Sequence, residues 1–164
     1  MKRTILALVL LCALAVACSE HTYDAKYRSD CPRFAALSTS TETVTAGVPV
    51  VLTCVEQRAG KLLDRTTYTW TVMPAEGLSI ETSVPAEGVY DGVSPTATVT
   101  FPAPGNYTVT FRGDYRGSGQ VNYFEESETL ADGTTARYSA NTGGEGSNHR
   151  DYLHAQLTRR IVVK

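Results

Sequence analysis

The stretch TATVTFPAPGNYTVTF, residues 96–111, decides the fold of this chain. Val99 and Phe101 alternate with threonines before a Pro-Ala-Pro-Gly connector, and Tyr107 and Val109 alternate with polar residues after it. Period-two alternation of β-branched and aromatic residues is typical of strands that bury one face. Because proline donates no backbone hydrogen bond, the connector ends one strand before the next begins. The stretch therefore predicts a pair of strands at the centre of a β-sandwich, with threonines facing water.

The same alternation predicts further strands on both sides of this pair. We expect strands over residues 34–37, 48–54, 66–73, 78–80 and 157–163. Trp70 falls on the apolar face of its strand, where we expect a core residue rather than a binding platform. Arg159 interrupts the apolar face of the last strand and indicates a bulge or a position at a sheet edge.

The N-terminal segment has the pattern of a signal rather than of a folded element. Lys2 and Arg3 form a basic start, and residues 5–17 are a run of apolar and small residues too short to span a bilayer as a stable helix. The run ends in Ala-Val-Ala before Cys18 and resembles a lipoprotein signal, in which such a cysteine is lipidated and becomes the N-terminus. The resemblance implies lipidation of Cys18. The alternative is an ordinary secretory signal cleaved near Ala17, which would leave Cys18 as a free thiol.

These features divide the chain into three parts. Residues 1–17 are the expected signal peptide, and residues 18–30 are a polar tether without periodicity. Residues 31–164 are the expected β-sandwich, with an insertion at about residues 116–152. Ser19 stands where lipoproteins retained in the inner membrane carry Asp. The resemblance therefore implies a lipid-anchored protein of the outer membrane, on its periplasmic or its cell-surface side.

The charge of the expected mature chain argues against nucleic acid as a partner. Loss of Lys2 and Arg3 leaves 13 of the 15 basic residues against 17 acidic ones, a net charge of −4. No cluster of Lys and Arg stands out that could neutralise phosphates. The partners that we expect are the membrane, through the lipid, and a glycan or a protein.

The insertion contains a predicted hairpin and several aromatic residues. Residues 121–130 and 134–140 flank Asp132-Gly133, a dipeptide that favours a tight primed turn. Aromatic side chains on a loop carried by a rigid sandwich can stack on sugars or bury partner side chains. The candidate partner-binding residues are Tyr115, Tyr123, Phe124, Tyr138 and Tyr152. The alternative is a small satellite core under the hairpin, with Tyr123 and Tyr138 paired across it. We expect the sandwich to fold without the insertion, because the last strand can still close the sheet.

Two further cysteines are candidates for a disulfide. Cys12 leaves with the expected signal and Cys18 is lipidated, so Cys31 and Cys54 remain as a pair in an oxidising compartment. Cys54 ends the second predicted strand and Cys31 precedes the first. Antiparallel pairing brings those ends together, provided that residues 38–45 leave the ladder. We therefore expect a Cys31–Cys54 disulfide; the alternative is a buried Cys54 and an exposed Cys31.

No pattern of catalytic or metal-binding residues stands out. His149 and His154 flank Asp151, but their Gly-rich and strand-like surroundings do not favour a metal site. A carboxylate cluster consists of Glu125, Glu126, Glu128 and Asp132. Because alternation places Glu126 and Glu128 on one face of the hairpin, the cluster is expected to guard a solvated edge rather than to supply an acid and a base. The chain has no Gly-x-Ser-x-Gly motif and no phosphate-binding loop. We therefore expect no enzyme, no cofactor and no metal.

The order of three segments resembles a known family. AGVPVVLTC (46–54), TYTWTV (67–72) and ATVTFPAPGNYTVTF (97–111) together resemble a PKD-like, immunoglobulin-like domain. The most specific part is Phe-Pro-x-Pro-Gly-x-Tyr-x-Val at residues 101–109, which is similar to the family's penultimate strand. The Trp-x-Phe-Gly-Asp-Gly element of many PKD repeats is missing, because Trp70 is followed by Thr-Val-Met. This marks a divergent member and gives no support for calcium binding.

The expected fold is therefore all-β: an immunoglobulin-like/PKD-like antiparallel β-sandwich with an inserted hairpin before the last strand. The expected function is that of a non-catalytic binding or adhesion module at the cell surface or in the envelope, for a glycan or a protein. The alternative is a structural spacer or an assembly subunit of an envelope complex, with the hairpin as its docking edge. An enzyme is a third hypothesis, which no motif supports.

Overall fold

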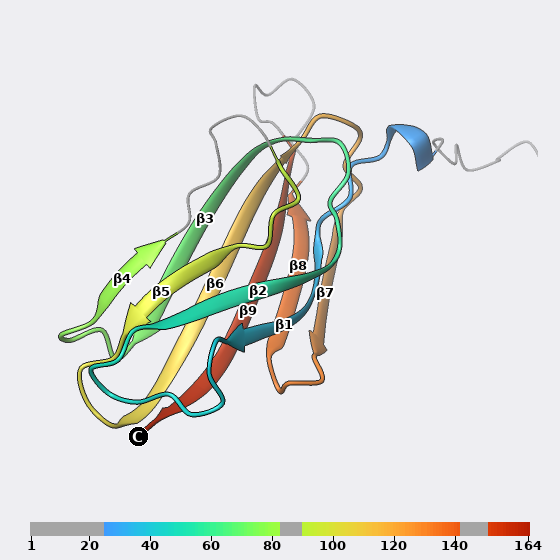
Figure 1. The fold of residues 1–164 in the computed structure, drawn as a ribbon. Helices are drawn as coiled ribbons and strands as arrows, with labels where there is room; N and C mark the ends of the chain where they lie inside the picture. Colours follow the sequence, from blue (N-terminus) through green and yellow to red (C-terminus); the bar gives the residue numbers. More distant parts are fainter. Residues whose placement is uncertain (1–24, 83–89, 142–150) are drawn as a thin grey trace, which may run out of the picture.

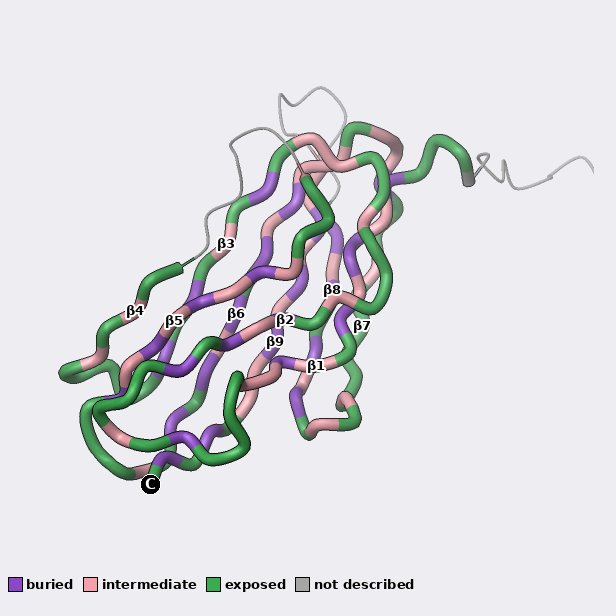
Figure 2. Tube along the Cα trace, in the orientation of Figure 1, coloured by how far each residue is buried: buried purple, intermediate pink, exposed green. Residues whose placement is uncertain are grey.

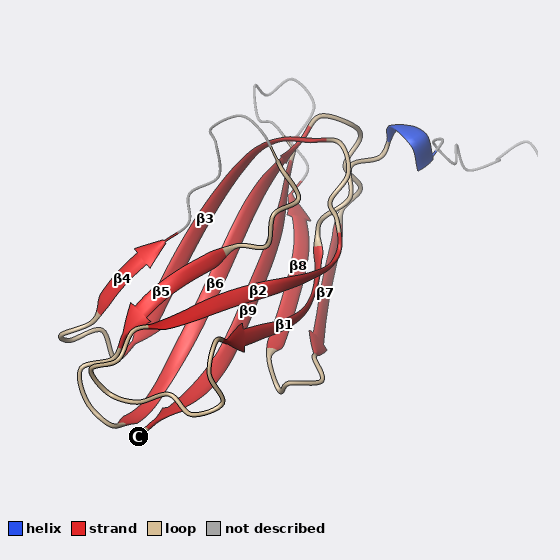
Figure 3. Ribbon diagram, in the orientation of Figure 1, coloured by secondary structure: helices blue, strands red, loops and turns tan. Residues whose placement is uncertain are grey.

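Nine strands form two antiparallel sheets in the part of the chain that the structure describes (Figure 1 and Figure 3). The structure is a computed structural model, and it describes residues 25–82, 90–141 and 151–164. The four-stranded sheet has the order β1 (Arg33–Thr39), β2 (Val50–Arg58), β5 (Thr96–Thr100) and β4 (Ser79–Thr82). The five-stranded sheet has the order β3 (Leu63–Met73), β6 (Gly105–Gly117), β9 (Tyr152–Val163), β8 (Thr135–Asn141) and β7 (Phe124–Thr129). A short 3-10 helix, η1 (Ala25–Tyr27), precedes β1, and no helix within these residues is long and apolar enough to cross a membrane. The predicted sandwich with its inserted hairpin is confirmed.

The stretch that decides the fold forms β5 and β6, and these two strands lie in different sheets. The Pro-Ala-Pro-Gly connector therefore carries the chain from one layer of the sandwich to the other. The Tyr107 hydroxyl donates a hydrogen bond to the Ala103 carbonyl at 2.9 Å, which ties β6 to this connector. β6 then pairs with β3 on one side and with β9 on the other, so the larger sheet is built around it.

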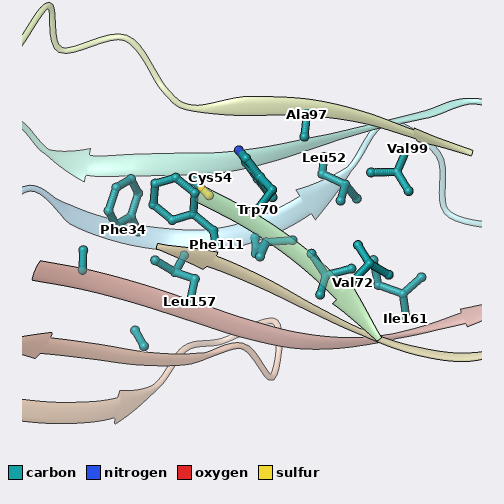
Figure 4. Close-up of a cluster of buried hydrophobic side chains, with 14 of the residues drawn as sticks. Phe34, Leu52, Cys54, Trp70, Val72, Ala97, Val99, Phe111, Leu157 and Ile161 are labelled. Carbon is teal, nitrogen blue, oxygen red and sulfur yellow. The ribbon is translucent and has the colours of Figure 1, made fainter. Parts of the chain in front are cut away.

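The core lies between the two sheets, and its aromatic residues gather around Phe111 (Figure 4). The ring centroid of Phe111 lies 5.1 Å from that of Trp70, 5.4 Å from that of Tyr68 and 5.8 Å from that of Phe34 in the opposite sheet. Buried and exposed residues alternate along the strands, as a period of two requires (Figure 2). Trp70 is 8% exposed, so its predicted place in the core is confirmed.

The insertion folds as the predicted hairpin and extends the larger sheet. Asp132 and Gly133 lie in the turn between β7 and β8, where Gly133 has a φ of 81°, in the left-handed region that glycine favours. The predicted tight primed turn is not formed, because Asp132 does not have a positive φ and the Leu130 N–H closes a longer loop by donating to the Thr134 carbonyl at 2.8 Å. β8 pairs along its whole length with β9. Its inward side chains, Ala136, Tyr138 and Ala140, are at most 1% exposed. The hairpin therefore supplies part of the main core, and the expectation that the sandwich folds without it does not fit the structure.

The hairpin also satisfies the outer edge of β1. The Phe34 N–H donates to the Tyr138 hydroxyl at 3.1 Å. The Leu37 N–H donates to the Asp132 carboxylate at 3.1 Å, and the Leu37 carbonyl accepts a hydrogen bond from the Arg159 guanidinium at 2.5 Å. An edge strand otherwise leaves such backbone groups unpaired. Side chains of β8, β9 and the turn thus replace the neighbouring strand that β1 lacks.

These contacts explain the charged residue in the last strand. β6 and β9 pair without a register shift from Gly105 to Arg116, so the predicted bulge at Arg159 is absent. Arg159 instead reaches the edge of β1, where it also lies 3.4 Å from the Asp132 carboxylate. β9 lies between β6 and β8 in its sheet, and its pairing with β8 ends at Thr158, so the second alternative, a position at a sheet edge, holds only for the β8 side of Arg159.

The predicted disulfide is not present in the structure, because Cys31 and Cys54 are both free, buried thiols. Cys54 pairs with Leu37, whereas Asp30, the neighbour of Cys31, forms a bridge with Lys61. Within β2 itself, Arg58, which pairs with Arg33, already lies four residues beyond Cys54, a span of roughly 13 Å in an extended strand. A disulfide needs Cα atoms within about 7 Å of each other. The strand register therefore keeps the two thiols apart.

We expect both thiols to be unreactive in the folded protein. Burial raises the pKa of Cys31 from its ordinary value of 9.0 to about 12, and burial raises the pKa of Cys54 well above that value. Above about pH 9 the unfolded thiols lose protons that the folded thiols keep, so the free energy of unfolding falls as the pH rises from about 9 towards 12.

Alkylation at pH 8 followed by peptide mapping should leave Cys31 and Cys54 unmodified until the chain is denatured. Rapid labelling of the native protein, or a disulfide between the two cysteines, would contradict the structure.

The hydrogen bond between Tyr138 and the edge of β1 predicts that two tyrosine variants differ in their free energy of unfolding. Tyr138→Phe keeps the ring and removes only the hydroxyl that accepts the buried Phe34 N–H. An unsatisfied buried donor costs about 1–3 kcal/mol, so we expect a loss of that size in the free energy of unfolding, measured by chemical denaturation. Tyr123→Phe is the matched control, because Tyr123 is 71% exposed. Equal stability of the two variants would show that this hydrogen bond does not close the edge.

Candidate functional site

The structure separates the five aromatic residues that were predicted to bind a partner. Tyr115 and Tyr138 are 0% and 1% exposed, so both belong to the core and are not accessible to a partner. Tyr138 pairs with Glu126 rather than with Tyr123, so the predicted pair across the hairpin is not formed. Tyr115 and Tyr138 are buried because they occupy inward positions on β6 and β8. The sequence pattern alone did not assign these two positions to the main core.

The other three aromatic residues do not form one surface. Tyr123 is 71% exposed and lies just before β7. Phe124 pairs with Ala140, which faces the core, whereas Tyr152 pairs with Asn141, which faces solvent. Because Phe124 and Tyr152 thus lie on opposite faces of the sheet, they cannot contact one ligand on a single face.

A groove lies over the solvent face of the five-stranded sheet. It has a volume of about 630 Å³ and is formed by side chains of β6, β7, β8 and β9. Its polar lining includes Arg112, Glu125, Arg137, Asn141, His154 and Gln156. We call it the sheet groove.

Strand register explains why these residues meet. Arg112 pairs with Gln156, which in turn pairs with Arg137 on the next strand. Two residues along, Asp114 pairs with His154. The intervening residues of β6, β8 and β9 are buried in the core, so these cross-strand rows point to solvent. Three strands that are distant in the sequence therefore place polar side chains side by side.

A chain of hydrogen bonds holds one end of the sheet groove. The Arg112 Nε donates to the Asp114 carboxylate at 2.9 Å, and the His154 Nδ1 lies 2.5 Å from the same carboxylate. The Asn141 side-chain amide lies 3.1 Å from the His154 Nε2, and the Tyr152 ring is stacked near the His154 ring with centroids 6.4 Å apart. Burial alone would raise the pKa of Asp114, but the hydrogen bonds from His154 and Arg112 outweigh it and lower that pKa. The carboxylate therefore stays ionised and fixes both neighbouring side chains.

The hydrogen bonds of this cluster fix the orientation of Arg112 and His154 around the Asp114 carboxylate. An aspartate that orients a histidine is also found in hydrolases, where the second ring nitrogen activates a nucleophile. Here the second ring nitrogen of His154 faces the Asn141 amide. Within the described residues no three side chains cluster as metal ligands, and His149 lies outside those residues.

Other groups in the sheet groove are available to a ligand. Arg137, Glu125 and Gln156 make no side-chain hydrogen bond or ion pair with the described part of the protein, although all three line the groove. They offer a guanidinium, a carboxylate and an amide, which can donate and accept hydrogen bonds. The sequence-based prediction considered Glu125 only as part of a carboxylate cluster and missed Arg137 and Gln156, because it treated polar residues between apolar ones as the solvated side of a strand.

A comparison with protein families matches residues 35–120 to the PKD domain, over more than half of the chain. The chain belongs to the PKD domain family. Searches of curated proteins and of solved structures found no match. The matched residues of this PKD domain run from β1 to the end of β6, so the hairpin and β9 lie outside the match. PKD domains are generally non-catalytic, immunoglobulin-like modules, in keeping with a groove that positions polar side chains.

Proposed function

We propose that this PKD domain is a lipid-anchored, non-catalytic binding module of the outer membrane that holds a glycan in the sheet groove. The observation that carries the proposal is the groove itself, in which charged and amide groups that have no side-chain partner among the described residues stand on a packed sheet. Its volume of about 630 Å³ lies within the range of small-ligand sites. The ligand therefore has to be polar and rich in groups that both donate and accept hydrogen bonds.

Sugar hydroxyls have this double capacity, and the groove matches them with side chains of both kinds. Arg137 and Gln156 can donate to ring and hydroxyl oxygens, while Glu125 can accept from hydroxyl groups. Tyr152 does not line the groove itself, but it is half-buried and its ring is stacked near that of His154, which does. An aromatic ring at the end of a polar groove can pack against the apolar face of a sugar.

The lipid anchor would hold this domain close to the membrane. Cys18, the proposed site of lipidation, and residues 18–24 lie outside the described residues. A segment of seven residues reaches at most about 25 Å, and the described chain begins at Ala25. Anchoring by several acyl chains is stable, because each buried methylene contributes about 0.8 kcal/mol.

The glycan proposal predicts that groove variants lose binding. On a glycan array, the protein should bind a defined set of saccharides, and Arg137→Ala or Gln156→Ala should weaken that binding roughly tenfold, about 1.4 kcal/mol. Arg160→Ala is the matched control, because Arg160 is exposed on the same strand and sheet face as Gln156 but does not line the groove. Failure to bind any saccharide, or equal binding by Arg137→Ala and Arg160→Ala, would contradict the proposal.

The anchor is tested separately. Cys18→Ala should abolish labelling with a radioactive or alkyne-tagged fatty acid and should release the protein from the membrane fraction, because no acyl chain then buries in the bilayer. Cys12→Ala is the matched control and should remain labelled and membrane-bound. Persistent labelling of the Cys18→Ala variant would show that the lipoprotein interpretation is wrong.

A further inference from the structure

We propose that the free edge of β3 is a self-association surface, on which a second copy of this chain adds its own β3 in the antiparallel direction. The surface is distinct from the sheet groove and does not depend on its ligand. The two copies would join their larger sheets edge to edge. The proposal follows from a comparison of the four sheet edges with one another.

Three of the four edges carry features that block strand addition. β1 is closed by side chains of the hairpin and of Arg159. β4 has only four residues, Ser79–Thr82. β7 carries glutamates at positions 125, 126 and 128, and charged side chains are a common protection of edge strands. These edges are therefore poor templates for another chain.

The edge formed by β3 lacks these protections. The strand has 11 residues, Leu63–Met73, and lies at the end of its sheet. Its pairing with β6 has one register shift, between Leu63 and Arg65, and is regular from Arg65 to Met73. From Thr66 to Met73 it carries no charged side chain. Residues 66–73 are therefore a regular, uncharged edge whose outward N–H and C=O groups have no sheet partner among the described residues, and such an edge is a template for a further strand.

The chemistry of this edge favours a second copy as the occupant. Antiparallel pairing about a two-fold axis at Thr69 places Thr67 opposite Thr71 of the second copy. Cross-strand threonine pairs are favourable, and the same symmetry opposes Arg65 with Met73, so no like charges meet. Antiparallel pairing of two β7 strands about a two-fold axis at the centre of β7 would place Glu125 opposite Glu128, so that like charges would repel each other. An incoming strand has to be extended, uncharged and rich in β-branched residues, and residues 66–73 of β3 are themselves such a stretch.

A cysteine placed on the two-fold axis tests the geometry. In the full chain, Thr69→Cys should form a reducible covalent dimer under mild oxidation, because directly opposed residues bring their Cβ atoms to about 5 Å. Thr108→Cys is the matched control, since Thr108 is also exposed but lies on the central strand β6. The wild-type chain reports any background from the native cysteines. Cross-linking of Thr69→Cys no greater than that of Thr108→Cys would overturn the proposal.

A second variant tests the association without a covalent bond. Thr69→Lys sets two ammonium groups opposite each other and should shift the full chain from dimer towards monomer in sedimentation velocity, with an unchanged circular dichroism spectrum. Thr108→Lys should leave the dimer intact. A wild-type chain that stays monomeric at its highest soluble concentration, or a Thr69→Cys variant that links only to a different protein, would also overturn the assignment to a second copy.

Discussion

The unpaired backbone edge of β1 is the constraint that organises the second half of this molecule. Phe34 and Leu37 present N–H and C=O groups on the side away from β2, at the seam between the two sheets. Tyr138, Asp132 and Arg159 satisfy them at distances of 2.5 to 3.1 Å. A buried backbone group without a partner lowers the free energy of unfolding by about as much as a lost hydrogen bond does. These side-chain contacts therefore fix the position of the hairpin and of the last strand relative to β1. The insertion is thus a structural part of the sandwich.

The same hairpin contributes both to the stability of the fold and to the candidate binding site. Along β8, the inward side chains fill the core while the outward ones, including Arg137 and Asn141, line the sheet groove. A change that loosened the contact of Tyr138 with β1 would therefore also displace the groove. Rigidity of this kind favours binding, because little conformational entropy is lost when a ligand orders side chains that already stand on a packed sheet.

The two faces and the edges of the larger sheet have different chemistry and, in our proposals, different roles. The inner face packs around Phe111, the outer face carries charged and amide groups, and β3 leaves one uncharged edge open. A ligand in the groove and a second copy at the edge would occupy separate surfaces. An assembly role and a glycan-binding role are therefore compatible in one small domain.

The sequence by itself determined the strands, the core position of Trp70 and the hairpin turn at Asp132-Gly133, because period-two alternation and turn chemistry act between residues that are close along the chain. Only the tertiary structure decided which strands became neighbours. The burial of Tyr115 and Tyr138, the separation of Cys31 from Cys54 and the meeting of groove residues all follow from register between distant strands. Register depends on how two sheets pack and on which edges remain to be satisfied, and neither is encoded in a local pattern.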